Sequence, residues 1–435
     1  MTDTITIDKL TSKNLLIKNI FMNIVTQGFP LIIAVFTIPM IIRGLGTEKF
    51  SILTLIWMII GYTSIFDLGL GRALTQLVSK KLGTEDIEDL SVTIWTSLAL
   101  IAAISLMITT ILFLLAPIFV TKIFKIPSIY APETLTSVYM LILVLPTVII
   151  TASLKGILEA HQKFAILGLL KLPIAFFNYI GPLLVLPFSK SLVYTVGMLV
   201  IGRIIIFILH IIACLKIVDN LLNKIHFSKK YVKDLLSFGG WITVSNIFTP
   251  IMTNMDRYYI ASALSALIVA FYTVPFDMLV RLWILPDSIT GVMFPAFSME
   301  FQRDKIRAKR LYVKAVKYIF FIMILPIVFI LLFAKIGLSI WINPTFADKS
   351  FHIAQLIAIG ILVNSIGEPA YALIQASGRS DITAKIHMLE FPVYIFLLWF
   401  LVRYLGLVGA ALAWVIRFFI DTIILNILAI KILKN

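Results

Sequence analysis

The sequence predicts an all-α integral membrane protein with about twelve transmembrane helices, arranged as two parallel six-helix repeats around a central cavity. Three observations lead to this fold class. Hydrophobic residues make up 60% of the chain and charged residues 14%, which leaves too little polar surface for a water-soluble domain. The apolar residues fall into runs of about 20, the length that crosses a bilayer as a helix. The two halves of the 435 residues also resemble one another in polar positions.

The predicted spans divide equally between the two halves. A polar tail covers residues 1–15, a first bundle covers 16–217, a lysine-rich linker covers 218–237 and a second bundle covers 238–432. The spans of the first bundle are Leu16 to Ile42, Thr47 to Leu68, Leu90 to Ala116, Glu133 to Leu154, Phe164 to Phe188 and Leu192 to Leu215. Those of the second are Phe238 to Ile260, Ser265 to Ala296, Tyr312 to Ile342, Phe351 to Ile374, Ala384 to Val402 and Leu407 to Ile430.

Lysine and arginine predict the orientation of these spans. They concentrate in the two tails and in the even-numbered connections, so the positive-inside rule puts both termini in the cytoplasm. The formal net charge of +15 is therefore better explained by topology than by nucleic-acid binding. The single cysteine, Cys214, excludes an internal disulfide. Without a Walker motif, a nucleophile constellation or metal-ligand spacing, we expect a transporter that has no cofactor and no metal and is not an enzyme.

Polar positions recur between the halves at nearly one spacing. Asp67, near the end of the second span, recurs as Asp287 near the end of the eighth. Arg203 in the sixth span recurs as Arg417 in the twelfth, at a distance close to half of the chain. Six spans return the chain to the same side of the membrane, so the halves would be parallel repeats. This arrangement is typical of transporters that work by alternating access.

Four segments carry a resemblance to a known family. FDLGLGRALTQ at residues 66–76 resembles the end of the second helix in bacterial polysaccharide transporters, the O-antigen flippase branch of the superfamily that also holds multidrug extruders. The segment at 256–275 resembles that family's connection between spans 7 and 8, and the exits of spans 4 and 10 match as well.

That resemblance implies a function, a substrate and a membrane. A family member would flip an undecaprenyl-pyrophosphate-linked oligosaccharide across the bacterial inner (plasma) membrane by alternating access, for O-antigen, lipopolysaccharide or other surface polysaccharide biosynthesis. Membrane lipid would surround it. A polysaccharide polymerase and a chain-length regulator are further candidate partners.

The candidate phosphate contacts are arginines, because a guanidinium donates paired hydrogen bonds and stays charged when buried. They are Arg203, Arg257, Arg281 and Arg417. Arg417 has Asp421 one helical turn later, and Arg281 has Asp277 one turn earlier, so an internal ion pair is the alternative for each. Arg203 has no acid within reach on its own helix, so it either faces the cavity or pairs with an acid on a neighbouring helix.

Four acids are candidates for gating or for coupling to H⁺ or Na⁺: Glu368, Asp67, Asp256 and Asp421. Glu368 precedes Pro369 inside the tenth span, where a proline can unwind the helix. A cap or helix-end anchor is the favoured alternative for Asp67, and Asp256 lies near the outer end of its span. Trp283, two positions from Arg281, is a candidate sugar contact, with interfacial anchoring as the alternative.

Other functions remain alternatives. A cation-coupled multidrug extruder would share the architecture but would need an acid-rich cavity for cationic substrates. A membrane-embedded glycan polymerase or ligase would need a large periplasmic loop, and the predicted spans leave none of that size. A peptidoglycan-precursor flippase would have two additional spans.

Overall fold

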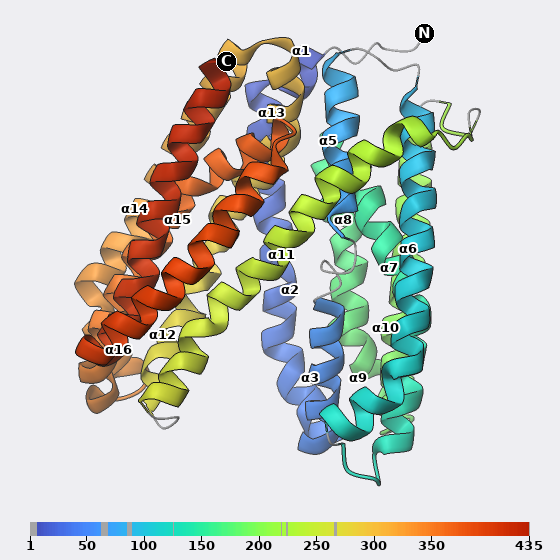
Figure 1. Cartoon of the computed structure of the whole chain (residues 1–435). Helices are drawn as coiled ribbons and strands as arrows, with labels where there is room; N and C mark the ends of the chain where they lie inside the picture. The colour runs from blue at the N-terminus through green and yellow to red at the C-terminus, as the bar shows by residue number, and fades with distance from the viewer. Residues whose placement is uncertain are drawn as a thin grey trace. The chain divides into compact units, whose positions relative to one another are not determined.

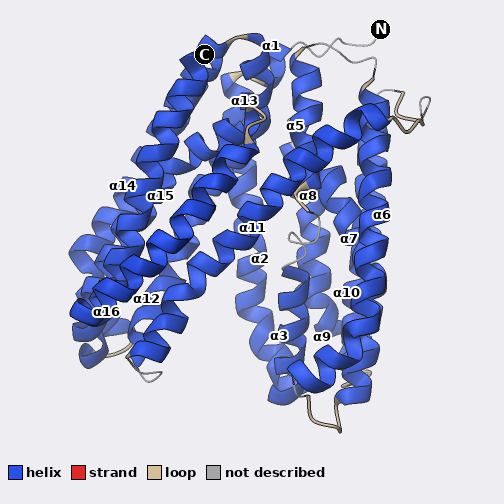
Figure 2. Ribbon diagram, in the orientation of Figure 1, coloured by secondary structure: helices blue, strands red, loops and turns tan. Residues whose placement is uncertain are grey.

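Helices make up nearly all of the structure. It is a computed structural model that describes residues 7–61, 68–84, 89–124, 126–218, 220–222, 225–264 and 268–434. No strand occurs in these ranges (Figure 2). The chain divides into two compact units, Met1–Gly240 and Trp241–Asn435, and the helix α11 (Lys229–Ala263) runs through the point of division (Figure 1). The predicted all-α membrane class is confirmed.

The N-terminal unit begins with a short helix and continues through long apolar ones. Its elements are α1 (Ile7–Leu10), α2 (Lys13–Leu45), α3 (Thr47–Gly61), α5 (Leu70–Gly83), α6 (Leu90–Ile118), the π-helix η1 (Phe119–Ile123), α7 (Ala131–Ala160), α8 (Phe164–Ala175), the π-helix η2 (Phe176–Ile180), α9 (Gly181–Val185) and α10 (Leu192–Ile217). Within this unit α7 packs against α6 and α10, and α2 packs against α8.

Apolar side chains and an ion pair hold one end of the N-terminal unit together. A core of fully buried side chains joins α2, α3 and α10, with Leu53 and Val196 at its centre. The Lys49 ammonium, near the start of α3, lies 2.9 Å from the Glu133 carboxylate at the start of α7. The other oxygen of Glu133 accepts a hydrogen bond from the Leu192 backbone at the start of α10. One carboxylate therefore ties three helix ends together.

The C-terminal unit contains the second part of α11 and six further described elements. They are α12 (Ala270–Leu279), the 3₁₀-helix η4 (Val280–Trp283), α13 (Ile284–Arg303), α14 (Lys305–Trp341), α15 (Pro344–Ala376) and α16 (Ser380–Lys434). Side-chain caps start two of them, because the Asp304 carboxylate accepts from the Ile306 backbone and the Asn343 amide oxygen accepts from Phe346. Helix α15 is the central packing partner, with α13, α14 and α16 against it.

Helix α14 has one exposed apolar face and other faces that are buried in the protein. One face carries exposed side chains at intervals of about one helical turn, with Phe321 68%, Leu325 77%, Phe329 63% and Ile340 84% exposed. Large apolar groups that water would disfavour belong in hydrocarbon, so this face is the lipid-facing one. Small or apolar residues on other faces of the same helix, among them Ala315, are buried.

Helix α16 is two helices joined by a tight turn. Gly406 has φ 57° and ψ −133°, a conformation that interrupts the helix and that side chains rarely adopt. Gly409 supports the turn, because a Cβ atom there would lie 2.1 Å from the Leu401 carbonyl oxygen. We refer to the parts before and after Gly406 as the first and second segments of α16.

The number of spans agrees with the prediction as far as the described residues reach. Ten helices in those ranges are long and apolar enough to cross a membrane, and α16 among them consists of two segments. Helix α3 ends at Gly61, where the described part of the chain is interrupted. The prediction of about twelve spans is consistent with this arrangement and stays a prediction.

Candidate functional site

The most unusual feature of the C-terminal unit is a buried arginine between two buried acids. Arg417 is 5% exposed, Glu390 7% and Asp421 6%. The Nε atom of Arg417 lies 3.8 Å from Oε2 of Glu390, which is ion-pair distance but too long for a hydrogen bond. Isolated charges are expensive inside a membrane protein, so three in one place indicate a special site. We call these three residues the acid–arginine cluster.

The turn in α16 creates this cluster. Glu390 lies on the first segment, whereas Arg417 and Asp421 lie one helical turn apart on the second. Because the chain reverses at Gly406, the two segments run side by side and bring the carboxylate to the guanidinium. The sequence spacing predicted a pair between Arg417 and Asp421. The ion pair that the structure contains is instead the one with Glu390.

The environment of the cluster offers aromatic faces and few hydrogen-bond partners. The Arg417 guanidinium lies 5.2 Å from the Tyr394 ring centre and 4.8 Å from that of Phe418, both within cation–π range. Within the described part of the chain, Nε and Nη1 of Arg417 and both carboxylate oxygens of Glu390 are buried and have no hydrogen-bond partner. Buried polar groups are almost always hydrogen-bonded, so these buried atoms mark an unusual polar site.

Asp256, a predicted coupling residue, belongs to the same region. It lies on α11, is fully buried and accepts a hydrogen bond from the Tyr272 hydroxyl of α12. The Arg257 backbone also donates to Asp256, at 2.8 Å. The positive charge of Arg417 acts on the Asp256 carboxylate and on the Tyr394 hydroxyl. Asp256, Arg417 and Asp421, which lie far apart in sequence, are thus brought into one electrostatic neighbourhood.

Arg257 and Arg281 occupy different surroundings. Arg257 pairs with Asp277 on α12, Nη2 to Oδ1 at 2.5 Å, and its guanidinium lies 4.9 Å from the Phe276 ring centre. The predicted alternative partner of Asp277 was Arg281, four residues later. Asp277 pairs with Arg257 instead. Arg281 lies within η4, where 3₁₀ winding departs from the α-helical spacing that brings residues four apart together. Arg281 is exposed on η4.

Arg203 lies in the N-terminal unit with an uncharged partner. Its Nη2 atom donates to Oδ1 of Asn178 at 3.3 Å, and Asn178 belongs to η2. The close approach depends on Gly202, because a Cβ atom there would lie 2.4 Å from Cβ of Phe177. Nε of Arg203 is buried, and within the described ranges it has neither a hydrogen-bond partner nor an acid at ion-pair distance. Among the described residues, no acid on a neighbouring helix pairs with Arg203.

The remaining predicted residues fall outside the acid–arginine cluster or outside the described chain. Asp67 lies outside the described residues. Glu368 is half-buried on α15, and the helix continues from Pro344 to Ala376 through Pro369 without the local unwinding that was expected. Trp283 is half-buried and stacks on Trp414 with ring centres 6.2 Å apart, so it has a packing role in the protein interior.

Two charged residues inside spans were missed by sequence reasoning. Glu390 is the ion-pair partner of Arg417, and Lys171 on α8 donates to the Asn23 amide oxygen of α2 at 3.0 Å. Both lie within apolar runs that had been predicted as spans, so the signal was present. In the described ranges no group of three His, Cys, Asp or Glu side chains has a geometry that would hold a metal ion.

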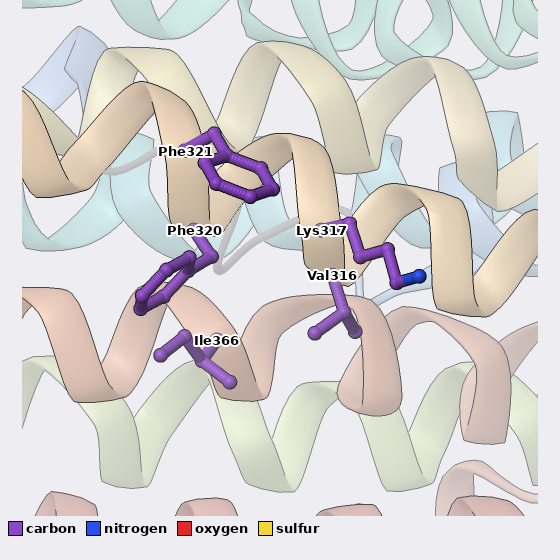
Figure 3. Close-up of a pocket in the computed structure, with 5 residues that line it drawn as sticks. All are labelled: Val316, Lys317, Phe320, Phe321 and Ile366. Carbon is purple, nitrogen blue, oxygen red and sulfur yellow. The ribbon is translucent and has the colours of Figure 1, made fainter.

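A shallow cavity on the C-terminal unit is lined by none of the residues of the acid–arginine cluster. It measures about 320 Å³ and is lined by Val316, Lys317, Phe320, Phe321 and Ile366, from α14 and α15 (Figure 3). Four of the five lining side chains are apolar, and Phe321 belongs to the lipid-facing stripe of α14. The cavity suits hydrocarbon rather than a sugar or a phosphate.

Bundles of long apolar helices with ionisable side chains buried inside them define a multi-pass membrane protein of the transporter type. The comparison with known families gives the more particular assignment. The chain belongs to the polysaccharide biosynthesis protein family, whose family model matches residues 16–301. The predicted resemblance to polysaccharide transporters is confirmed.

Individual relatives agree with this assignment. The chain is 30% identical over 418 residues to a putative O-antigen transporter of Shigella flexneri, a match that covers 94% of this chain and 97% of that protein. It is 27% identical over 219 residues to the lipopolysaccharide biosynthesis protein WzxC of Escherichia coli (strain K12), covering 48% of this chain and 42% of that protein.

Solved structures show the same fold at low sequence identity. A MATE protein in a bent conformation has a TM-score of 0.86 at 15% identity and covers 100% of this chain and 98% of its own. A MOP superfamily transporter from Pyrococcus furiosus has a TM-score of 0.85 at 15% identity, with 99% of both chains covered. At this level of sequence identity, the similarities establish the fold alone.

Proposed function

We propose that this protein is a flippase that moves an undecaprenyl-pyrophosphate-linked oligosaccharide across the bacterial inner membrane for O-antigen or other surface polysaccharide biosynthesis. It is a transporter and not an enzyme. The observation that carries the proposal is the similarity, over nearly the whole of both chains, to a protein named as a putative O-antigen transporter. Both termini would lie in the cytoplasm, as the distribution of lysine and arginine predicts.

The mechanism we propose is alternating access between the two helical bundles around a central cavity. The pyrophosphate would bind to arginine while the sugar crosses inside the cavity and the lipid tail stays in hydrocarbon. Arg203 is the strongest candidate for this contact, because its only described partner is the Asn178 amide and a guanidinium binds phosphate through paired hydrogen bonds. Arg281, exposed on η4, and Arg257, paired with Asp277, are further candidates.

Arg417 is the weakest of the four candidates for phosphate binding. Its guanidinium is 5% exposed and already faces Glu390 and Asp421. A phosphate placed there would add negative charge to a site that holds two acids, and like charges repel strongly in a low dielectric. We therefore assign Arg417, with Asp256 and Asp421, to gating or ion coupling, together with Glu368 and Asp67.

A reconstituted flipping assay tests the phosphate contact. Purified protein in liposomes is given a fluorescent undecaprenyl-pyrophosphate oligosaccharide, and the fraction exposed in each leaflet is followed. We expect Arg203→Lys to keep part of the wild-type rate and Arg203→Ala to lose at least about tenfold, since hydrogen bonds to charged groups contribute about 1.5–3 kcal/mol. Arg43→Ala, at an exposed arginine of the same unit, is the matched control and should flip normally. Full activity of Arg203→Ala would show that Arg203 does not bind the phosphate.

A deletion strain tests the function itself. Loss of the gene should abolish a surface glycan and leave undecaprenyl-linked repeat units on the cytoplasmic leaflet. Normal surface glycan in a clean deletion would overturn the proposal. The alternative, a cation-coupled multidrug extruder, predicts instead that the deletion strain becomes sensitive to cationic drugs. Co-purification with a polysaccharide polymerase or a chain-length regulator would identify the further partners that we propose.

A further inference from the structure

The acid–arginine cluster contains one more negative charge than positive charge when its side chains are ionised. Glu390 and Asp421 each contribute a carboxylate, Arg417 contributes one guanidinium, and all three are more than nine-tenths buried. Salt and water screen such charges poorly in the interior of a membrane protein. The cluster therefore needs one additional positive charge.

The surrounding elements do not supply that charge. The titratable groups whose charges act on Arg417 or on its described neighbours are Asp256 on α11, Tyr272 on α12, and His387 and Tyr394 on the first segment of α16. Asp256 is a further acid. Arg257, the cation adjacent to Asp256, is paired with Asp277. Charge from the described part of the chain thus leaves the cluster negative.

The arrangement of the two carboxyl groups indicates which cation would balance the excess negative charge. Glu390 and Asp421 lie on the two segments of α16, both buried, and each carboxylate acts electrostatically on the other and on Arg417. Two carboxylates have four acceptor oxygens between them and no donor. Both oxygens of Glu390 and Oδ1 of Asp421 are buried and lack a donor among the described residues. A hydrogen atom on one carboxyl group would provide the missing donor and remove the excess negative charge.

We propose that Glu390 and Asp421 share one proton beside Arg417, and that this pair is a proton-binding site. A metal cation fits less well. Hard cations require several oxygen ligands, and the described ranges hold no group of three acidic, histidine or cysteine side chains arranged for a metal. The Arg417 guanidinium, 3.8 Å from Glu390, also occupies one side of the site with a positive charge.

Proton binding would act on the turn of α16. The two acids belong to the two segments that Gly406 joins, so a shared proton holds the segments together. When the proton leaves to water, two like charges face each other and push the segments apart. The step is a proton transfer between water and a carboxylate oxygen. Its role in transport rests on the proposed function: one proton would be bound and released in each flipping cycle.

Infrared spectroscopy of the full-length protein in lipid nanodiscs tests the site directly, because a protonated carboxyl group absorbs apart from a carboxylate. Relative to the wild type at neutral pH, Glu390→Gln and Asp421→Asn should each lose one protonated carboxyl, since the remaining acid then pairs with Arg417. Arg417→Gln should gain one. Asp348→Asn, at an exposed acid 2.8 Å from Lys335, is the matched control and should change nothing in this signal.

The outcomes separate the inference from the proposed function. An unchanged signal in either acid variant would overturn the shared proton, provided that thermal unfolding shows the variant to be folded. A flipping assay with an imposed pH gradient forms the second arm. The gradient should speed the wild type severalfold and leave Glu390→Gln unaffected. A gradient response retained in Glu390→Gln would overturn the coupling role. If the wild-type protein shows the proton signal but flips no lipid-linked oligosaccharide, the proposed flippase function is overturned. The proposed proton-binding site is then still supported.

Discussion

Replacing Arg417 should destabilise the protein far more than replacing either of its acidic neighbours. At the observed 3.8 Å, the attraction between the guanidinium and the Glu390 carboxylate is about 4 kcal/mol in the effective dielectric of a protein. Desolvation offsets part of that attraction, but removing one partner of a buried pair still costs about 3–5 kcal/mol. Arg417→Met leaves two buried acids without a cation, so we expect a loss in this range at alkaline pH.

The variants of the two acids do not leave a buried charge without a counter-charge. In Glu390→Gln the arginine keeps Asp421 as a counter-charge, and in Asp421→Asn it keeps Glu390. Each variant removes an excess charge and retains the shape of the side chain, so the free energy of unfolding should change by about 1 kcal/mol or less. The three substitutions thus distinguish a cluster with two acids from a simple ion pair, in which both partners would matter equally.

Unfolding by SDS in mixed micelles, followed by tryptophan fluorescence, measures these differences. Trp414 is fully buried and its ring lies 4.5 Å from that of Phe418, next to Arg417, so its emission reports the state of this region. The loss in Arg417→Met should shrink at acidic pH, because protonated carboxyl groups need no counter-ion. Equal losses in all three variants, or a loss in Arg417→Met that does not depend on pH, would refute the reasoning.

Three further substitutions test the packing around this site. Gly360→Ala places a Cβ atom 2.5 Å from the Trp414 ring and should cost about 1–3 kcal/mol in thermal stability, whereas Gly337→Ala meets nothing within 4 Å and serves as the control. Gly406→Ala forces a side chain into φ 57° and should cost about 1–3 kcal/mol, again measured by thermal unfolding. Trp283→Phe keeps the stacked ring and should retain stability but weaken oligosaccharide binding by about 1 kcal/mol if the indole N–H binds sugar. Unchanged binding would leave Trp283 with a packing role alone.

The fold could be predicted from the sequence because a helix needs a minimum length of apolar residues to cross a bilayer. Every apolar run of about 20 residues has one stable solution, a spanning helix that satisfies its own backbone hydrogen bonds. Local departures from this solution were harder to predict. The π-helical turns of η2 and the 3₁₀ turns of η4 have no strong sequence signal, and each of them redirects side chains that matter, Asn178 and Arg281. The direction of a side chain within a span therefore needed the structure.

The candidate site was predictable in part for a related reason. A charge inside an apolar run is conspicuous, so Arg203, Arg417 and Asp256 could be found from the sequence alone. Partners could be predicted only along one helix, where a spacing of four residues brings side chains together. The partner of Arg417 is Glu390, which reaches it across the turn at Gly406. No spacing rule predicts such a contact, because the geometry of the turn decides it.

The two arginines that recur between the halves illustrate how repeats diverge. Gly202 lets α10 approach η2, so Arg203 meets the neutral amide of Asn178, and no acid among the described residues neutralises its charge. In the other half Arg417 meets two buried acids, and the balance of charge is reversed. A phosphate is attracted to the first environment and repelled by the second, whereas a proton is attracted to the second. If the halves arose by duplication, the two proposals assign equivalent residues to anion binding in one bundle and to proton binding in the other.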